Sequence, residues 1–175
     1  MTARADSSAA SRFTSDTAAL SKLYGEGLVA GVLGAATIAV WFLILDTLRG
    51  HPFYTPTVLG TALFRSGAGL GAPAALPVSF DMVLAFTWIH LLVFGVIGGI
   101  ASHLLALAER RPNLGFGVVI LFVVFEFGFI AASMIFAEDV VHAVAWPAVL
   151  VGNTLAAAAM AAYLWHHHPN LRIEP

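Results

Sequence analysis

Two ionisable residues, His90 and Glu126, lie deep inside long apolar runs of this sequence. Counted at 1.5 Å per helical residue from Asp81 and Ala137, where the two runs meet the same side of a membrane, they lie about 14 Å and about 16 Å deep. Ionisable groups at such depth are rare and pair with one another or mark a functional site. We expect His90 and Glu126 to be partners, with Asn153 at a comparable level in the last apolar run.

Three interpretations compete for this polar layer. A neutral or paired Glu126 could simply lock the helices together, and this structural interpretation is the one we favour. A proton or ion path would use the same residues, but no chain of carboxylates runs from face to face. A haem or pigment site would need an axial ligand such as His90. His103 is a poor second ligand, because thirteen residues place it about 20 Å further along the same helix.

A second group of candidate ligands clusters where the apolar runs end. His142 follows Asp139 by three positions and Glu138 by four, so a helix would present all three on one face. His51 comes from the loop on the same side, and these residue types suit zinc, manganese or ferrous iron. Their spacing matches no named metal motif, and the ends of spans are also where charged residues reach water.

The stretch WFLILDTLRGHPFYTPTVLG, residues 41–60, combines an apolar run with turn residues. Gly50 is placed to end a helix in a left-handed conformation. Thr55 and Pro56 predict a new helix, with the threonine as its cap and the proline at its first position. The polar motif that we single out here consists of Asp46, Arg49, His51, Pro52, Thr55 and Pro56.

Two further expectations concern this motif. The residue before Pro52 is disfavoured in helical geometry, which predicts a turn at His51. Asp46 and Arg49 are three positions apart and can pair while both side chains reach outward to water.

Composition defines the class of protein that must position these residues. The chain is 59% hydrophobic and 10% charged over 175 residues, with a mean hydropathy of +0.89. Soluble domains are about 45–50% apolar and about 25% charged. A net charge of −2 without a basic cluster gives no reason to expect a nucleic-acid partner, and the lack of cysteine excludes disulfides and thiolate metal sites. We expect an integral membrane protein in contact with the lipid bilayer.

The apolar runs predict an all-α bundle of four transmembrane helices, since each run approaches or exceeds the roughly 20 residues that a span requires. The spans are expected at about 27–48, 80–107, 114–137 and 140–165, within a transmembrane domain of residues 26–166. The loop of residues 49–79 would contain a short surface or re-entrant helix on the outer face. Residues 1–25 form a polar N-terminal segment, irregular at first with a short surface helix at 14–24, and residues 167–175 form a polar tail.

The positive charges predict the orientation. With four spans, six of the eight lysines and arginines fall on the side of the two termini. The positive-inside rule then places both termini of the multi-pass protein in the cytoplasm.

Residues 27–60, GLVAGVLGAATIAVWFLILDTLRGHPFYTPTVLG, also carry a resemblance. They resemble a WFLxxDxxxGxPxxTPxxLG-type pattern found in small uncharacterised bacterial four-helix membrane proteins, a group without an established activity. The resemblance covers about the first third of the chain. It implies the four-helix fold, a bacterial origin and hence a place in a bacterial inner membrane, and it assigns no catalytic residue.

No phosphate-binding loop, nucleotide fingerprint or hydrolase elbow occurs in the sequence, so we do not expect an enzyme. We expect a structural or accessory subunit of a larger bacterial membrane complex, respiratory or photosynthetic, that docks on other subunits through its transmembrane faces and outer loop. No cofactor is predicted for that role, although a bound lipid or pigment is compatible with it. The alternative is a small haem- or metal-binding membrane protein that uses His90, or His51 with His142, Asp139 and Glu138.

Overall fold

The computed structural model describes residues 2–66, 76–110 and 146–168, and this part of the chain is helical without strands. Helix α1 runs from Thr2 to Leu48, α2 from Tyr54 to Phe64, α3 from Phe80 to Arg110 and α6 from Trp146 to His167. The sections Leu20–Leu48, Phe80–Glu109 and Pro147–His167 are each long and apolar enough to cross a membrane. These helices agree with three of the expected spans, as is typical of a membrane protein, whereas the expected span at 114–137 lies outside the described residues.

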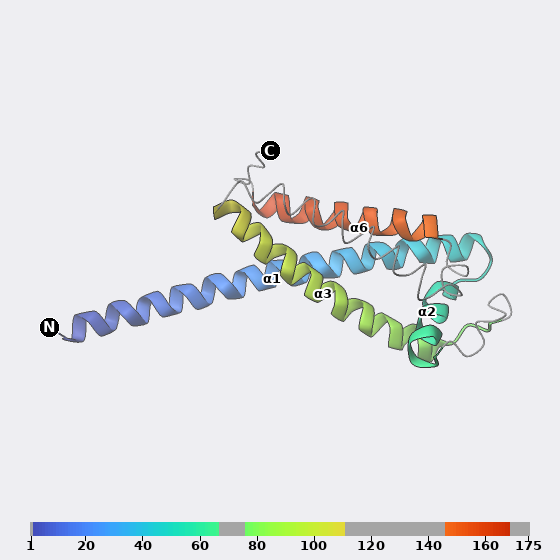
Figure 1. The fold of residues 1–175 in the computed structure, drawn as a ribbon, viewed down its shortest axis with the longest axis horizontal. Helices are drawn as coiled ribbons and strands as arrows, with labels where there is room; N and C mark the ends of the chain where they lie inside the picture. Colours follow the sequence, from blue (N-terminus) through green and yellow to red (C-terminus); the bar gives the residue numbers. More distant parts are fainter. Residues whose placement is uncertain (1, 67–75, 111–145, 169–175) are drawn as a thin grey trace.

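Helix α1 is the centre of the arrangement. It packs against both α3 and α6, while the short α2 packs mainly against α3 at the end where α1 finishes (Figure 1). The N-terminal part of α1 extends well beyond the other helices. We expected this part of the chain to begin irregularly and to form a separate surface helix, and that expectation was wrong. Residues 2–24 contain neither glycine nor proline, so nothing in the sequence interrupts a helix that continues into the apolar span.

Glycines set the distance between α1 and α3. A Cβ atom on Gly31 would run into the backbone of Phe94, and one on Gly27 would meet the carbonyl of Gly98. Contacts this close between helices are typical of membrane proteins, where small residues let two backbones approach. Gly98 makes the closest approach on α3, because a Cβ on Gly95 or Gly99 would reach only side-chain atoms at ordinary contact distance. Gly95 also lies at this interface, since a Cβ on Gly31 would come 3.0 Å from its Cα.

Helix α6 also packs against α1. Gly34 faces the side chain of Met160, and Gly152 faces the indole of Trp41. The indole nitrogen of Trp41 also donates a 2.8 Å hydrogen bond to the carbonyl oxygen of Ala148, in the first turn of α6. Trp41 therefore fixes the beginning of α6 against the last turns of α1.

We predict opposite effects for two glycines of α1. Gly31→Ala should lower the free energy of unfolding by about 1–3 kcal/mol, because the added methyl group forces α1 and α3 apart. Gly25→Ala should leave stability unchanged or raise it by up to about 1 kcal/mol, since nothing lies within 4 Å of its Cβ position and alanine favours a helix. Thermal unfolding of the two variants in the same mild detergent measures the difference, and equal effects would contradict this interface.

Candidate functional site

The carboxylate of Asp46 is buried, with an exposed fraction of only 1%. Its Oδ2 accepts a 2.7 Å hydrogen bond from the backbone amide of Thr55, and its Oδ1 accepts a 2.8 Å hydrogen bond from the hydroxyl of Thr55. Hydrogen bonds to an ionised acceptor are about twice as strong as those between neutral groups. The carboxylate also lies at the N-terminus of α2, where the helix dipole favours negative charge. We call Asp46, Gly50, Phe53 and Thr55 the α2 corner.

The end of α1 presents Asp46 to this corner. The amide of Gly50 donates to the carbonyl of Thr47 at 3.0 Å, and the amide of His51 donates to the carbonyl of Asp46 at 2.9 Å. Gly50 has φ +79°, as predicted for the residue that ends the helix. These two hydrogen bonds and the left-handed glycine form a Schellman motif. The chain therefore turns at Gly50, four residues after Asp46, and returns Thr55 to the Asp46 carboxylate.

Helix α2 begins differently from the prediction. Its N-cap position is Phe53, in a left-handed conformation at φ 66° and without a side-chain capping bond. Thr55 was expected to cap the helix and Pro56 to begin it, but both lie inside the first turn. Asp46 supplies the cap from another helix, nine residues earlier. Pro56 is tolerated because the first amides of a helix have no partner within it.

Arg49, His51 and Pro52 are exposed at the surface of the corner. The expected arrangement, in which Asp46 pairs with Arg49 and reaches outward, was wrong, because both carboxylate oxygens turn inward to Thr55. Burial, followed by the charge of Asp46, raises the pKa of the nearby Tyr54 phenol, and Arg49 opposes that rise. The corner is thus held together by Asp46 and Thr55 rather than by the arginine.

Helix α2 in turn positions the beginning of α3. The hydroxyl of Thr57 donates to the carbonyl of Phe53 at 2.8 Å and lies 3.4 Å from the amide of Ser79, just before α3. A Cβ on Gly60 would meet the backbone of Met82. Thr57 and Val58 are fully buried against this contact. Asp46 and Thr55 therefore join α1 to α2, and Thr57 and Gly60 join α2 to α3.

The expected metal site cannot be assembled from the described residues. Within residues 2–66, 76–110 and 146–168, no group of three or more histidine or acidic side chains could hold a metal ion. His51 lies exposed beside the α2 corner, whereas Glu138, Asp139 and His142 lie outside the described residues. This metal site stays a prediction.

His90 lies on α3 and is half-buried against α1. Its Nε2 lies 3.3 Å from the backbone carbonyl of Ala35, and its ring packs between those of Phe86 and Phe94. His90 thus contacts α1, an arrangement compatible with a role in joining the helices. Its expected partner Glu126 lies outside the described residues, while Asn153 is half-buried on α6. Neither the pairing with Glu126 nor haem ligation is tested by this arrangement.

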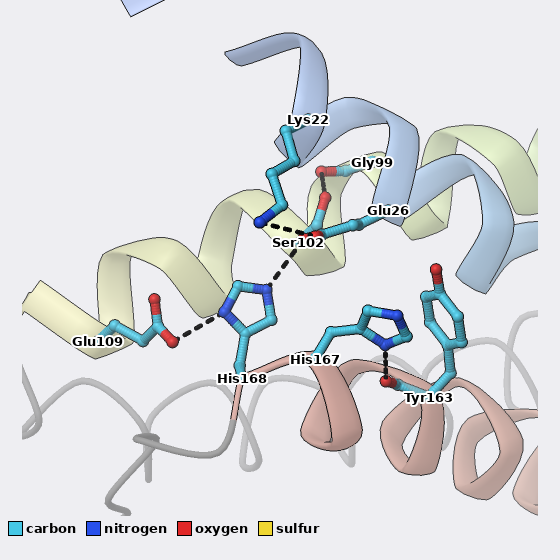
Figure 2. Close-up of polar contacts among 8 residues, drawn as sticks. All are labelled: Lys22, Glu26, Gly99, Ser102, Glu109, Tyr163, His167 and His168. Atoms are coloured by element: carbon cyan, nitrogen blue, oxygen red, sulfur yellow. Dashed lines mark hydrogen bonds and ion pairs between the residues drawn. The ribbon is translucent and has the colours of Figure 1, made fainter. Parts of the chain in front are cut away.

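A second polar cluster lies at the other end of the bundle. Beyond the last turn of α6, the imidazole of His168 lies between the carboxylates of Glu109 on α3 and Glu26 on α1 (Figure 2). Lys22 lies one turn before Glu26, with 3.9 Å between its Nζ and the Glu26 Oε1. We call Lys22, Glu26, Glu109 and His168 the His168 cluster.

The sequence analysis assigned residues 167–175 to a polar tail and did not find this cluster. Its residues come from three distant segments, so no spacing within the sequence indicates them. The only sequence signal is that Glu26 and Glu109 both border apolar runs that run in opposite directions, next to the histidines that end the last run.

Searches of protein-family models, curated proteins and solved structures found no match to this chain.

We predict that the α2 corner depends on the carboxylate of Asp46. Asp46→Ala should lower the free energy of unfolding by about 2–3 kcal/mol, because it leaves the amide and hydroxyl of Thr55 buried without an acceptor. Thr55→Val should cost less, since the backbone hydrogen bond remains. Thr47→Val is the matched control: its hydroxyl donates only to the carbonyl of Leu43 in its own helix, and its change should stay within about 0.5 kcal/mol. Denaturation in mild detergent measures all three, and a stable Asp46→Ala variant would rule out this role.

Proposed function

We propose that the protein is a structural accessory subunit of a larger bacterial membrane complex, such as a respiratory or photosynthetic one, and that it has no catalytic role of its own. The observation that supports this most is the use of Asp46. Its two oxygens are both bound by Thr55 and shielded from solvent, so the most distinctive motif of the sequence serves the fold. The helices then offer apolar surface to lipid and to neighbouring subunits.

Helix α2 is a candidate docking element. Thr55, Thr57 and Val58 are buried on its inner side, while Leu63 and Phe64 at its C-terminal end are about half exposed. Large apolar residues at the rim of a transmembrane bundle are suited to contact with another membrane subunit, because aromatic and apolar anchors dominate the energy of interfaces. The firm attachment of α2 through Asp46 would present these side chains in a fixed position.

We also propose that the protein has four spans, as the sequence predicts. Helices α3 and α6 both run from the α2 end of the bundle to the His168 end, since Trp41 holds the beginning of α6 and Glu109 meets His168. The end of α3 and the beginning of α6 therefore lie at opposite ends of the bundle, which supports one further span between them. From Glu26 to Asp46 this distance is about 30 Å at helical rise, which is the thickness of the hydrocarbon core of a membrane. The positive charges favour the cytoplasm for both termini.

Cysteine labelling tests this topology in a chain that has no cysteine of its own. A cysteine at the exposed position Ser66 should be labelled by an impermeant reagent from one side of the membrane, and cysteines at the exposed positions Ser21 and His166 only from the other. Labelling of Ser21→Cys and His166→Cys from opposite sides would contradict the four-span arrangement. The same experiment in inside-out vesicles identifies the cytoplasmic side.

The subunit role is tested by purification from native membranes at native expression level. The tagged wild-type protein should migrate with a larger complex, and the double substitution Leu63→Ser and Phe64→Ser should reduce co-purification by about 10-fold or more, the equivalent of roughly 1.4 kcal/mol. Leu20→Ser, at an exposed position on α1 far from α2, is the control that should leave it unchanged.

The visible absorption spectrum and the metal content of the same purified sample test the haem- or metal-binding alternative. A colourless protein within a larger complex supports the proposal. A coloured or metal-loaded protein that migrates alone would overturn it in favour of the haem- or metal-binding alternative, with His90, His51 and His142 as the residues to substitute.

A further inference from the structure

Each ring nitrogen of His168 faces a carboxylate. Nδ1 lies 2.8 Å from Oε1 of Glu109, and Nε2 lies 3.1 Å from Oε2 of Glu26. An ionised carboxylate can only accept hydrogen bonds, so each contact requires an N–H group on the facing nitrogen. A neutral imidazole carries one N–H and an imidazolium carries two. With both carboxylates ionised, the two contacts therefore exist together only when His168 holds an additional proton.

The charged groups that face His168 come from two helices. Helix α1 contributes Lys22 and Glu26, and α3 contributes Glu109. With a neutral imidazole these three charges sum to −1, and one proton on His168 brings the cluster to zero. The Lys22 side chain is 80% exposed and 3.9 Å from its partner, so it compensates the carboxylates weakly.

The residues of α6 beside the cluster do not compete for these contacts. The ring of His167 lies 2.9 Å from the carbonyl oxygen of Tyr163 in its own helix, and that of His166 packs edge-on against His167 (Figure 2 shows the first pair). The His168 side chain is only 15% exposed and that of Glu26 13%. Partial burial strengthens an ion pair relative to one in bulk water.

We propose that His168 is a proton-operated latch that ties the end of α6 to α1 and α3. With the proton bound, the imidazolium bridges Glu26 and Glu109 and holds three segments together. When the proton leaves, one ring nitrogen turns a lone pair toward a carboxylate, and that contact becomes repulsive. The end of α6 then separates from one of its neighbours.

The structure limits this opening to the end of the helix. Ala30, Met160 and Leu164 form a buried apolar cluster directly before the latch, joined by Phe94 and Leu105. These contacts do not depend on charge, so they keep α6 against α1 when the latch opens. The movement is confined to the chain after Leu164. The inference is independent of the proposed subunit function.

The test is thermal unfolding of the full chain in mild detergent from about pH 5 to about pH 9, a range that includes the histidine transition. At the acidic end, His168→Ala should lower the unfolding midpoint by about 2–4 °C relative to wild type, the scale of one modest interaction in a chain of this size. The difference should become smaller as the pH rises, because wild type then loses one of its two contacts. His167→Ala is the matched control and should show no such pH-dependent difference.

Glu109→Gln separates the latch from a general effect of pH. Its amide can donate to a neutral Nδ1 while Nε2 donates to Glu26, so the bridge should persist without the additional proton and the pH dependence should flatten. A His168→Ala difference that is constant over the whole range would overturn the proposal. So would a Glu109→Gln variant with the pH dependence of wild type.

Discussion

A buried carboxylate determines the geometry of the end of the bundle where α1, α2 and α3 meet. Removing the Asp46 side chain from water is costly unless its oxygens are hydrogen-bonded. Thr55 supplies both hydrogen bonds, and the N-terminus of α2 adds a favourable dipole. These contacts fix the direction in which α2 leaves α1. Helix α2 then contacts Ser79 and Met82 and so fixes where α3 begins.

The two long helices that leave this corner are held together by close backbone packing. Lipid tails are as apolar as the side chains, so helices in a membrane associate through van der Waals contact and polar bonds rather than through burial from water. The van der Waals contact is made by Gly31 against the backbone of Phe94. The polar contacts are made by His90 near the Ala35 carbonyl and by Trp41, whose indole donates to the Ala148 carbonyl. Polar contacts thus act at the α2 corner, within the bundle and at the His168 cluster, and apolar packing acts between them.

The sequence predicted those features that depend on local chemistry. Continuous apolar runs indicated where α1, α3 and α6 lie, Gly50 indicated the end of α1, and the segment after Pro56 indicated α2. Helix boundaries of this kind follow from span length and turn residues, both of which can be counted along the chain.

Features that depend on the relative placement of helices were not predictable. Asp46 is nine residues from Thr55 and was expected to pair with its neighbour Arg49, because only the path of the turn shows that it caps α2. Gly98 makes the closest approach of the α3 glycines to α1, and only the crossing of the two helices selects it among several. His168 meets Glu26 and Glu109 from a distant part of the chain, which no local pattern indicates.

Amide hydrogen exchange at Thr55 tests most directly whether Asp46 and Thr55 hold the α2 corner together. The Thr55 amide donates to Asp46 and has no acceptor within α2, as it lies in the first turn. Slow exchange in wild type, together with fast exchange in Asp46→Ala and unchanged exchange in the Thr47→Val control, is the predicted result. Fast exchange of the Thr55 amide in the wild-type protein would contradict the hydrogen bond between Asp46 and Thr55 and leave Asp46 available for another role.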